Sequence, residues 1–292
     1  MKLRDDLGTR MKAFYEEIPK TRLMRRTPVI IRIDGRAFHT FTKGFVRPFD
    51  EVFMEAMQKT TKYLCENIPG CVLGYCQSDE ISLVLVDYES FDTSAWFDYE
   101  VQKLCSISAS MATMAFNRFF SEGVKTLDAY VQEEDCPSAK TLHLLGVYAD
   151  AIAMGAMFDA RVFNIPKEEV TNCIYWRQLD ASRNSIQMLG QAHFKQKELE
   201  GKSCSEIQDM LMLQKGINWN DLPIPQKRGT CVVRREIFVE RQDLPEKYRG
   251  DLVQNNGRLG MFKMVWVIDK EIPIFKGEDR EYIEKLVYVG EK

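Results

Sequence analysis

Apolar and polar positions follow a strand period and a helix period in turn along the first half of the chain. Residues 27–34 are an apolar, β-branched run with Pro28 near its start, which predicts a strand. Residues 50–68 place apolar side chains at helical spacing, which predicts a helix with Asp50 as its N-cap. Residues 70–88 hold two β-rich runs joined through Gln77, Ser78 and Asp79, which predicts a hairpin.

The next two elements complete a recognisable order. Residues 94–120 are amphipathic and predict a long helix with Ser94 as a candidate cap, and residues 156–165 predict another strand. The resulting order is strand, helix, strand, strand, helix, strand. This is the split β-α-β pattern of a ferredoxin-like sheet, so we expect the α+β class.

The second half of the chain predicts two helical segments followed by two strands. Pro166 ends the last strand and opens a predicted helix over residues 167–194, and a polar helical segment follows over residues 197–216. Two long β-rich runs, 228–240 and 260–269, are separated by a stretch with an Asn-Asn-Gly turn. No repeat or low-complexity linker divides the chain. We therefore expect a catalytic region over residues 1–165, with a helical and β-hairpin region over 166–292 packed on it.

Composition narrows the class of protein. The 292 residues are 45% hydrophobic and 28% charged, which is typical of a soluble globular protein. A net charge of -3 excludes a globally basic nucleic-acid binder but allows a local basic patch. The first residues lack the apolar core of a signal peptide, and no apolar run approaches the roughly twenty residues of a membrane span. We expect a cytoplasmic protein without a membrane partner.

The eight cysteines do not indicate a metal centre. They form no Cys-x-x-Cys pair, and only three histidines accompany them, so we do not expect a zinc site. Scattered cysteines without a secretory signal are expected to be reduced, buried and small hydrophobic residues.

Two aspartates at predicted strand ends carry the candidate chemistry. The first strand and the central hairpin of a ferredoxin-like sheet are neighbours, so Asp34 and Asp79 can converge on one edge. Two close carboxylates cannot both stay ionised without a cation, and Mg²⁺ suits such a site. Gly35 would let a backbone carbonyl or a phosphate approach closely. The alternative is that Asp34-Gly35 is an ordinary turn and that Glu80, beside Asp79, is part of a solvated hairpin tip.

Three segments carry a resemblance to a known family. "RIDGRAFHTFT", "RPFD" and "GYCQSDEIS" resemble the tRNA-histidine guanylyltransferase family and its tRNA-histidine guanylyltransferase-like relatives. The resemblance runs from Arg32 to Asn184, and the "WRQ" segment and the RGT-containing strand extend it. It implies a polymerase-type palm domain and addition of nucleotides to the 5′ end of tRNA in the 3′-to-5′ direction.

The resemblance also implies roles for individual residues. Asp34 and Asp79 would be catalytic and would bind two Mg²⁺ ions together with the Gly35 carbonyl. Arg47 stands where the family commonly has Lys, which keeps the charge but changes its geometry. A nucleotide contact and a packing role are equally open for His39, and Glu80 is expected to be structural. The implied nucleotide-binding residues, for ATP and for GTP or another nucleoside triphosphate, are Asp34, Gly35, Arg36, Ala37, Phe38, His39, Arg47, Ser78, Asp79, Lys103 and Asn184.

The sequence departs from the family's eukaryotic pattern in two places. Where those members carry His-Ile-Asn-Asn, this chain has Ser-Arg-Asn-Ser at residues 182–185, which keeps only Asn184. This favours the guanylyltransferase-like proteins, which the family associates with templated repair of 5′-truncated tRNA, over non-templated G addition to tRNA-histidine. Arg177 and Asp180 lie at helical spacing, and we expect a structural ion pair. Residues 122–153 are longer than the eukaryotic connection, and no function is predicted for them.

The expected macromolecular partner is tRNA. Lys227 and Arg228 are predicted to contact RNA phosphates, whereas Arg234, Arg235, Lys247, Arg249 and Arg258 could equally be solubility devices. The family suggests a homotetramer. Rival interpretations are a nucleotide cyclase or forward polymerase on the same palm, or a non-enzymatic RNA-binding protein. The last would need aromatic residues on the sheet face, and residues 81–86 have none.

Overall fold

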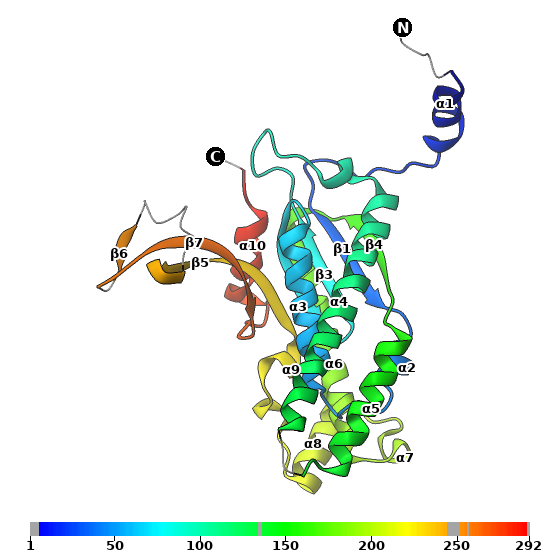
Figure 1. The fold of residues 1–292 in the computed structure, drawn as a ribbon, viewed down its shortest axis with the longest axis vertical. Helices are drawn as coiled ribbons and strands as arrows, with labels where there is room; N and C mark the ends of the chain where they lie inside the picture. The colour runs from blue at the N-terminus through cyan, green and yellow to red at the C-terminus, as the bar shows by residue number, and fades with distance from the viewer. Residues whose placement is uncertain (1–5, 134–135, 244–251, 256, 291–292) are drawn as a thin grey trace.

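A twisted antiparallel sheet of seven strands runs through the molecule, with helices on both faces (Figure 1). The computed structural model describes residues 6–133, 136–243, 252–255 and 257–290. In spatial order the strands are β4 (Phe158–Asn164), β1 (Val29–Gly35), β3 (Glu80–Leu85), β2 (Cys71–Gln77), β5 (Thr230–Glu240), β7 (Arg258–Asp269) and β6 (Val253–Asn255).

The first half of the chain has the predicted ferredoxin-like topology. β1 is followed by α3 (Glu51–Asn67), the β2–β3 hairpin, α4 (Val101–Gln132) and β4. β1 lies between β3 and β4 and is antiparallel to both. The predicted class and strand order are therefore confirmed, and β1 ends beside the β2–β3 turn.

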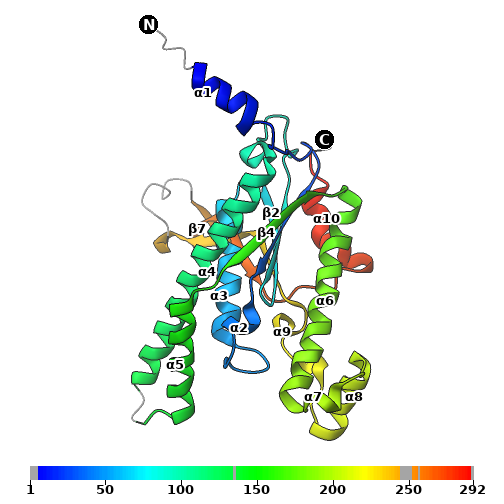
Figure 2. The ribbon, with the colours of Figure 1, turned by 90° about the vertical axis from the view of Figure 1, so that its right-hand side faces the viewer.

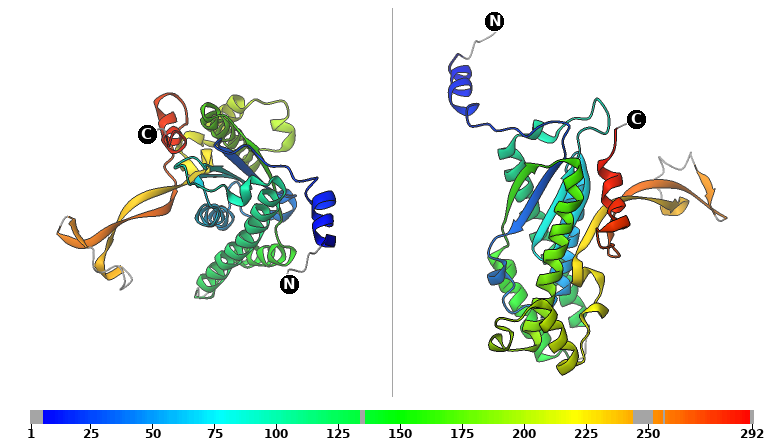
Figure 3. Two further views of the ribbon diagram at one scale, coloured as in Figure 1. Left: turned by 90° about the horizontal axis from the view of Figure 1, so that it is seen from above. Right: turned by 180° about the vertical axis from the view of Figure 1, so that it is seen from behind.

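The C-terminal hairpin extends the same sheet. β5 pairs with β2, with Gly74 opposite Val232, so the sheet continues across the predicted boundary at residue 165. β5 then pairs with β7 along a ribbon whose far part projects from the body (Figures 1 and 3). The division into regions 1–165 and 166–292 remains a prediction. Asn256, in the predicted turn, lies outside the described residues, as do Lys247 and Arg249.

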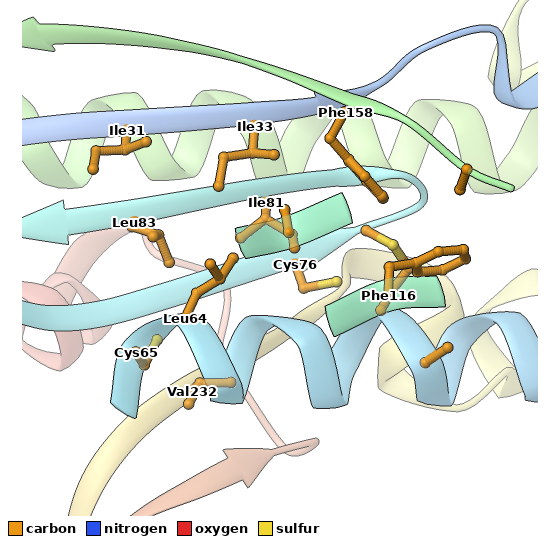
Figure 4. Close-up of a cluster of buried hydrophobic side chains, with 14 of the residues drawn as sticks. Ile31, Ile33, Leu64, Cys65, Cys76, Ile81, Leu83, Phe116, Phe158 and Val232 are labelled. Atoms are coloured by element: carbon orange, nitrogen blue, oxygen red, sulfur yellow. The ribbon is translucent and has the colours of Figure 1, made fainter. Parts of the chain in front are cut away.

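Each face of the sheet has its own apolar core. Alternate residues of β1 point to opposite sides, because successive side chains of a strand do so. One core packs α3, α4 and α2 (Phe38–Phe41) against the sheet, with Ile31, Ile33, Ile81 and Leu83 at its centre (Figure 4). The other packs α6 (Lys167–His193) and α10 (Glu281–Val287) against Ile30, Leu73, Tyr75 and Val84.

Of the two helix N-caps predicted from the sequence, one is confirmed and one is wrong. The Asp50 side chain accepts a hydrogen bond from Phe53 N at 3.0 Å, which confirms it as the cap of α3. Ser94 is not the cap of α4, which begins at Val101 after Glu100. Phe97 and Asp98, in the short helix η2 (Trp96–Tyr99), have positive φ angles. A continuous right-handed helix cannot pass through such residues, so the predicted start was wrong.

The long connection forms a second helix. α4 continues to Gln132, and α5 (Ala139–Met154) returns beside it before β4 (Figure 2). Residues 122–153 therefore belong mostly to a helical hairpin at the end of the molecule where β1 ends.

The remaining helices complete the two ends of the fold. α7 (Gln196–Leu199), α8 (Cys204–Lys215) and α9 (Ile224–Arg228) follow α6, and α8 packs on it through a small apolar cluster. α1 (Asp6–Met11) and η1 (Lys12–Glu16) contain no buried residue. The cysteines are free, and four are buried as predicted (Cys65, Cys71, Cys76 and Cys231). Contrary to prediction, Cys105, Cys173 and Cys204 are half-buried and Cys136 is exposed. Within the described residues, no helix is long and apolar enough to span a bilayer.

Candidate active site

The β2–β3 turn and the end of β1 meet as the sequence predicted. Gly35 N donates a hydrogen bond to the carbonyl of Asp79 at 3.1 Å. Asp34 lies opposite Glu80 in the β1–β3 register. The two predicted aspartates therefore lie at one edge of the sheet, each at the end of a strand that the apolar core fixes.

The environment of Asp79 fits a cation site. Burial raises the pKa of Asp79, and the charges of Asp34 and Glu80 raise it further. Ser78 Oγ donates to Asp79 Oδ1 at 3.1 Å and opposes this shift. No Lys or Arg of the described chain forms an ion pair with Asp79. Two carboxylates and a nearby backbone carbonyl are the hard oxygen donors that Mg²⁺ takes. Within the described residues, no group of three His, Cys, Asp or Glu side chains could hold a metal, so the carbonyl would be needed as a third ligand.

Asp34 has a neighbour that the sequence did not reveal. Arg161 on β4 lies 4.0 Å from Asp34 and 3.3 Å from Asp159, which is opposite Asp34 in the register. These side chains are about half exposed, so the pair is weak and can open. The sequence predicted a strand over residues 156–165. Arg161 could be placed beside Asp34 only once the register between β1 and β4 was known.

Gly35 has a packing role that the sequence did not reveal, and its predicted role at the metal site stays a prediction. A Cβ at this position would lie 2.3 Å from Cδ2 of Phe38. Glycine is therefore required because the chain turns back and lays the Phe38 ring against residue 35. The predicted close approach of a phosphate is not needed to explain it.

A cavity of about 590 Å³ opens beside the turn, between the segment after β1, α6 and α9. Figure 2 shows α2 and α9 between α5 and α6 at this end of the molecule. The predicted residues that line the cavity are Gly35, Ala37, Phe38, His39, Arg47, Ser78, Asp79, Asn184, Lys227 and Arg228. Asp34 and the exposed Arg36 flank it without lining it. Gln77 and Gln191 line it and were not predicted: Gln77 was assigned only to the hairpin turn, and Gln191 belongs to no motif.

Two residues predicted to contact a substrate, Phe38 and Lys227, have other partners in the structure. Phe38 is 5% exposed, and its ring packs against Phe116 and Phe158. Lys227 is buried, and its Nζ donates to the carbonyl of Asn220 at 2.5 Å. Burial and the charge of Arg228 lower the pKa of Lys227. One donor of the Lys227 amine is therefore used within the protein, and an RNA contact by this side chain stays a prediction.

Lys103 is not at the cavity. It contacts Glu100 at 3.8 Å and lies over the Phe97 ring. Thr113, on the same helix, accepts from the amide of Phe158, which is opposite Gly35. Lys103 precedes Thr113 by about 15 Å of helix at 1.5 Å per residue. The structure does not bring it to the predicted nucleotide site.

A buried ion pair ties α6 to the hairpin. Arg177 Nε and Nη2 donate to the two carboxylate oxygens of Glu80 at 2.6 and 2.7 Å, and Nη2 also donates to Asp180 at 2.9 Å. Burial alone would lower the pKa of Arg177, but the bond to Glu80 and the acidic charges raise it on balance. The structural roles predicted for Arg177, Asp180 and Glu80 are thus confirmed, and the partner of Glu80 was missed.

The Ser-Arg-Asn-Ser segment sits on α6 at the cavity wall. Ser182 Oγ donates to the carbonyl of Gln178, and Ser185 Oγ accepts from Trp219 Nε1 at 2.9 Å. Arg183 pairs with Asp180. In the described structure Asn184 is the member of this segment that lines the cavity without a side-chain hydrogen bond.

A ferredoxin-like sheet with two aspartates at its edge, beside a cavity of this size, defines a polymerase-type palm. Comparisons with known proteins agree. A family model described as tRNAHis guanylyltransferase matches residues 8–166. A bacterial tRNA(His) guanylyltransferase-like protein solved with ATP is 40% identical, with a TM-score of 0.74, covering 97% of this chain and 99% of that one. A structure described in the same words but with GTP is 37% identical, with a TM-score of 0.71, covering 98% and 100%.

A fission-yeast relative extends the likeness beyond bacteria. The tRNA(His) guanylyltransferase of Schizosaccharomyces pombe is 27% identical over 80% of this chain and 83% of that protein. The chain belongs to the tRNA-histidine guanylyltransferase family, and it is a nucleotidyltransferase that acts on the 5′ end of tRNA.

Proposed function

We propose that this protein repairs 5′-truncated tRNA by templated addition of nucleotides in the 3′-to-5′ direction. The observation that carries the proposal is the segment 182–185 of α6, of which Asn184 and Ser185 line the cavity. There Ser182, Arg183 and Ser185 use their polar atoms within the protein, and Asn184 remains to face a substrate. A site that selects guanine by itself needs several directed polar contacts. Since Ser182, Arg183 and Ser185 supply no free contact of this kind, pairing with the opposite strand of the acceptor stem selects the nucleotide.

The nucleotides bound by the similar structures support this proposal. One of the two bacterial structures holds ATP and the other holds GTP, on chains 40% and 37% identical to this one. Proteins similar to this chain therefore bind both purine nucleoside triphosphates. We extend both substrates to this chain, ATP for activation of a 5′-monophosphate and any nucleoside triphosphate for addition.

Activation transfers AMP from ATP to the 5′-monophosphate of the tRNA and releases pyrophosphate. In the addition step that follows, one P–O bond forms and one breaks. The 3′-hydroxyl of the incoming nucleotide attacks the 5′ phosphorus of the tRNA, and its proton passes to solvent. The leaving group is AMP from an activated end, or pyrophosphate from a 5′-triphosphate. Arg47 and Arg228, which line the cavity, bind phosphate oxygens, and Asn184 holds the nucleotide's sugar or base.

The two aspartates would hold Mg²⁺ together with the carbonyl of Gly35. The bound metal would neutralise the triphosphate and stabilise charge that develops on the attacking and leaving oxygens. Asp79 would contribute a carboxylate whose pKa is raised by burial and by neighbouring negative charges. It forms no ion pair with a Lys or Arg of the described chain. Arg161 lies 4.0 Å from Asp34, and this weak, half-exposed pair can open when a metal binds.

The tRNA surface is proposed around Arg228, whose side chain is partly exposed at the cavity. Arg235 and Arg258 each pair with an acidic residue, Asp269 and Glu240, which lowers their value as free phosphate contacts. A homotetramer and a cytoplasmic location remain predictions.

The test uses tRNA transcripts that lack their first nucleotide and differ in the base opposite the gap. The protein receives ATP, Mg²⁺ and all four nucleoside triphosphates, and the added nucleotide is identified. We expect the complement of the template base in each case. Addition of G whatever the template would instead support G addition to tRNA-histidine.

A further inference from the structure

The helix α5, for which the sequence predicted no function, contacts the wall of the cavity. Residues 42–50, here called the Arg47 loop, connect α2 to α3 and include Phe45, Val46, Arg47 and Asp50, all of which line the cavity. The Tyr148 hydroxyl, on α5, donates to Asp50 Oδ2 at 2.6 Å. Tyr148 and Asp50 are 1% and 5% exposed, so water does not compete for this bond.

Asp50 connects three parts of the chain through one carboxylate. Its Oδ1 accepts from Phe53 N at 3.0 Å, which caps α3. Its Oδ2 accepts from Val46 N at 2.9 Å as well as from Tyr148. The carboxylate therefore fixes the residue before Arg47 to the start of α3, and Tyr148 fixes the carboxylate.

Apolar contacts hold α5 against the same loop. The Tyr148 ring meets the ring of Phe45 edge-on, with centroids 5.0 Å apart, and that of Phe120 at 5.6 Å. A Cβ at Gly44 would be 3.1 Å from Val147, so α5 also packs closely on the loop backbone. Arg47 itself is exposed and forms no ion pair within the described chain. Its backbone is thus held while its guanidinium is left for a ligand.

We propose that Tyr148 is a positioning residue, which sets the affinity for the nucleoside triphosphate by holding the Arg47 loop through Asp50. The inference rests on the proposed function, because it needs Arg47 to bind the triphosphate. A guanidinium on a preorganised loop loses less entropy when it binds phosphate than one on a loop that must first be ordered. Loss of the hydroxyl should therefore weaken nucleotide binding more than it slows the chemical step.

The variant Tyr148→Phe removes the hydroxyl and keeps the ring in the aromatic cluster. Tyr282→Phe is the matched control, since the Tyr282 hydroxyl also donates to a buried aspartate, Asp269, at 2.8 Å, in the core around α10. Steady-state extension is measured with saturating truncated tRNA whose template base is C, and with GTP varied. Thermal unfolding of each variant is recorded in parallel.

For Tyr148→Phe we expect the KM for GTP to rise about tenfold, the value of one hydrogen bond to a charged group, with kcat changed less than about twofold. The two variants should lower the unfolding temperature by similar amounts. Tyr282→Phe should leave the KM for GTP unchanged. In an Arg47→Ala background, Tyr148→Phe should have no further effect on the KM, because neighbouring residues that act together are not additive.

Several outcomes would overturn the inference. An unchanged KM for GTP in Tyr148→Phe would refute the inference. The proposed function would still stand, provided that the wild type extends tRNA. An equal rise in KM for Tyr282→Phe would show a general effect of stability. A full effect of Tyr148→Phe in the Arg47→Ala background would show that Arg47 is not the residue it positions. A wild type that extends no 5′ end would refute the proposed function and this inference together.

Discussion

Replacing Arg177 with Met tests how much the Arg177–Glu80 ion pair, which joins α6 to the β2–β3 hairpin, contributes to the stability of the fold. Arg177 and Glu80 form two hydrogen bonds of 2.6 and 2.7 Å, with side chains 10% and 9% exposed. Met fills a similar volume but leaves the Glu80 carboxylate buried without its cation. Because Glu80 adjoins Asp79, the perturbation acts at the edge of the sheet that holds both aspartates.

The expected cost follows from this burial. Removing one partner of a buried ion pair destabilises a protein by about 3–5 kcal/mol, because the remaining charge loses its compensation. That is about a third of the stability of an ordinary domain. In the double variant Arg177→Met/Glu80→Gln no uncompensated charge remains, so more than half of the loss should be recovered.

The assay is urea unfolding at pH 7.5, followed by circular dichroism. Arg183→Met is the matched control, since Arg183 lies on the same helix, pairs with Asp180 and is 62% exposed. Such an exposed pair contributes about 0.5 kcal/mol. The reasoning would be refuted if Arg177→Met cost no more than Arg183→Met, or if the double variant were the least stable.

Three further predictions concern the site itself. Gly35→Ala should lower the free energy of unfolding in urea by about 1–3 kcal/mol, because its Cβ meets the Phe38 ring. Adding Phe38→Leu should recover part of this loss. If it does not, the ring is not the obstacle. Burial raises the folded pKa of Asp79 above its unfolded value, so ionisation disfavours the metal-free fold as pH rises through that window. Asp79→Asn should therefore unfold at a higher temperature than wild type at pH 7 without metal, and the gain should vanish below about pH 4; a constant gain would contradict the shift. Lys103→Ala should leave the KM for GTP within about twofold of wild type, since Lys103 contacts Glu100 and Phe97 away from the cavity; a larger rise would restore its predicted role.

The sequence predicted the sheet and the two aspartates because both depend on local pattern and a simple topological rule. Hydrophobic periodicity identified the strands, and the ferredoxin-like order makes the first strand a neighbour of the hairpin. Asp34 and Asp79 then had to lie at one edge.

What could not be predicted depends on tertiary contacts. Glu80 pairs with Arg177, which is distant in sequence, and Lys227 bonds to the backbone of nearby Asn220 only because that segment folds back on it. Charge alone does not show whether a side chain is free. The role of Gly35 depends on where the Phe38 ring folds back. The false start of α4 at Ser94 followed from positive φ angles that its amphipathic pattern does not reveal.

The central claim is that Asp34 and Asp79 form the catalytic centre for adding nucleotides to a tRNA 5′ end. The most direct measurement compares wild type with Asp79→Asn on a 5′-truncated tRNA, with ATP, Mg²⁺ and all four nucleoside triphosphates. Asp92→Asn, at an exposed position after β3, serves as the control. We expect wild type and Asp92→Asn to restore the template-matched nucleotide, and Asp79→Asn to fold but add none. Equal extension by Asp79→Asn would show that this carboxylate is not part of the catalytic centre.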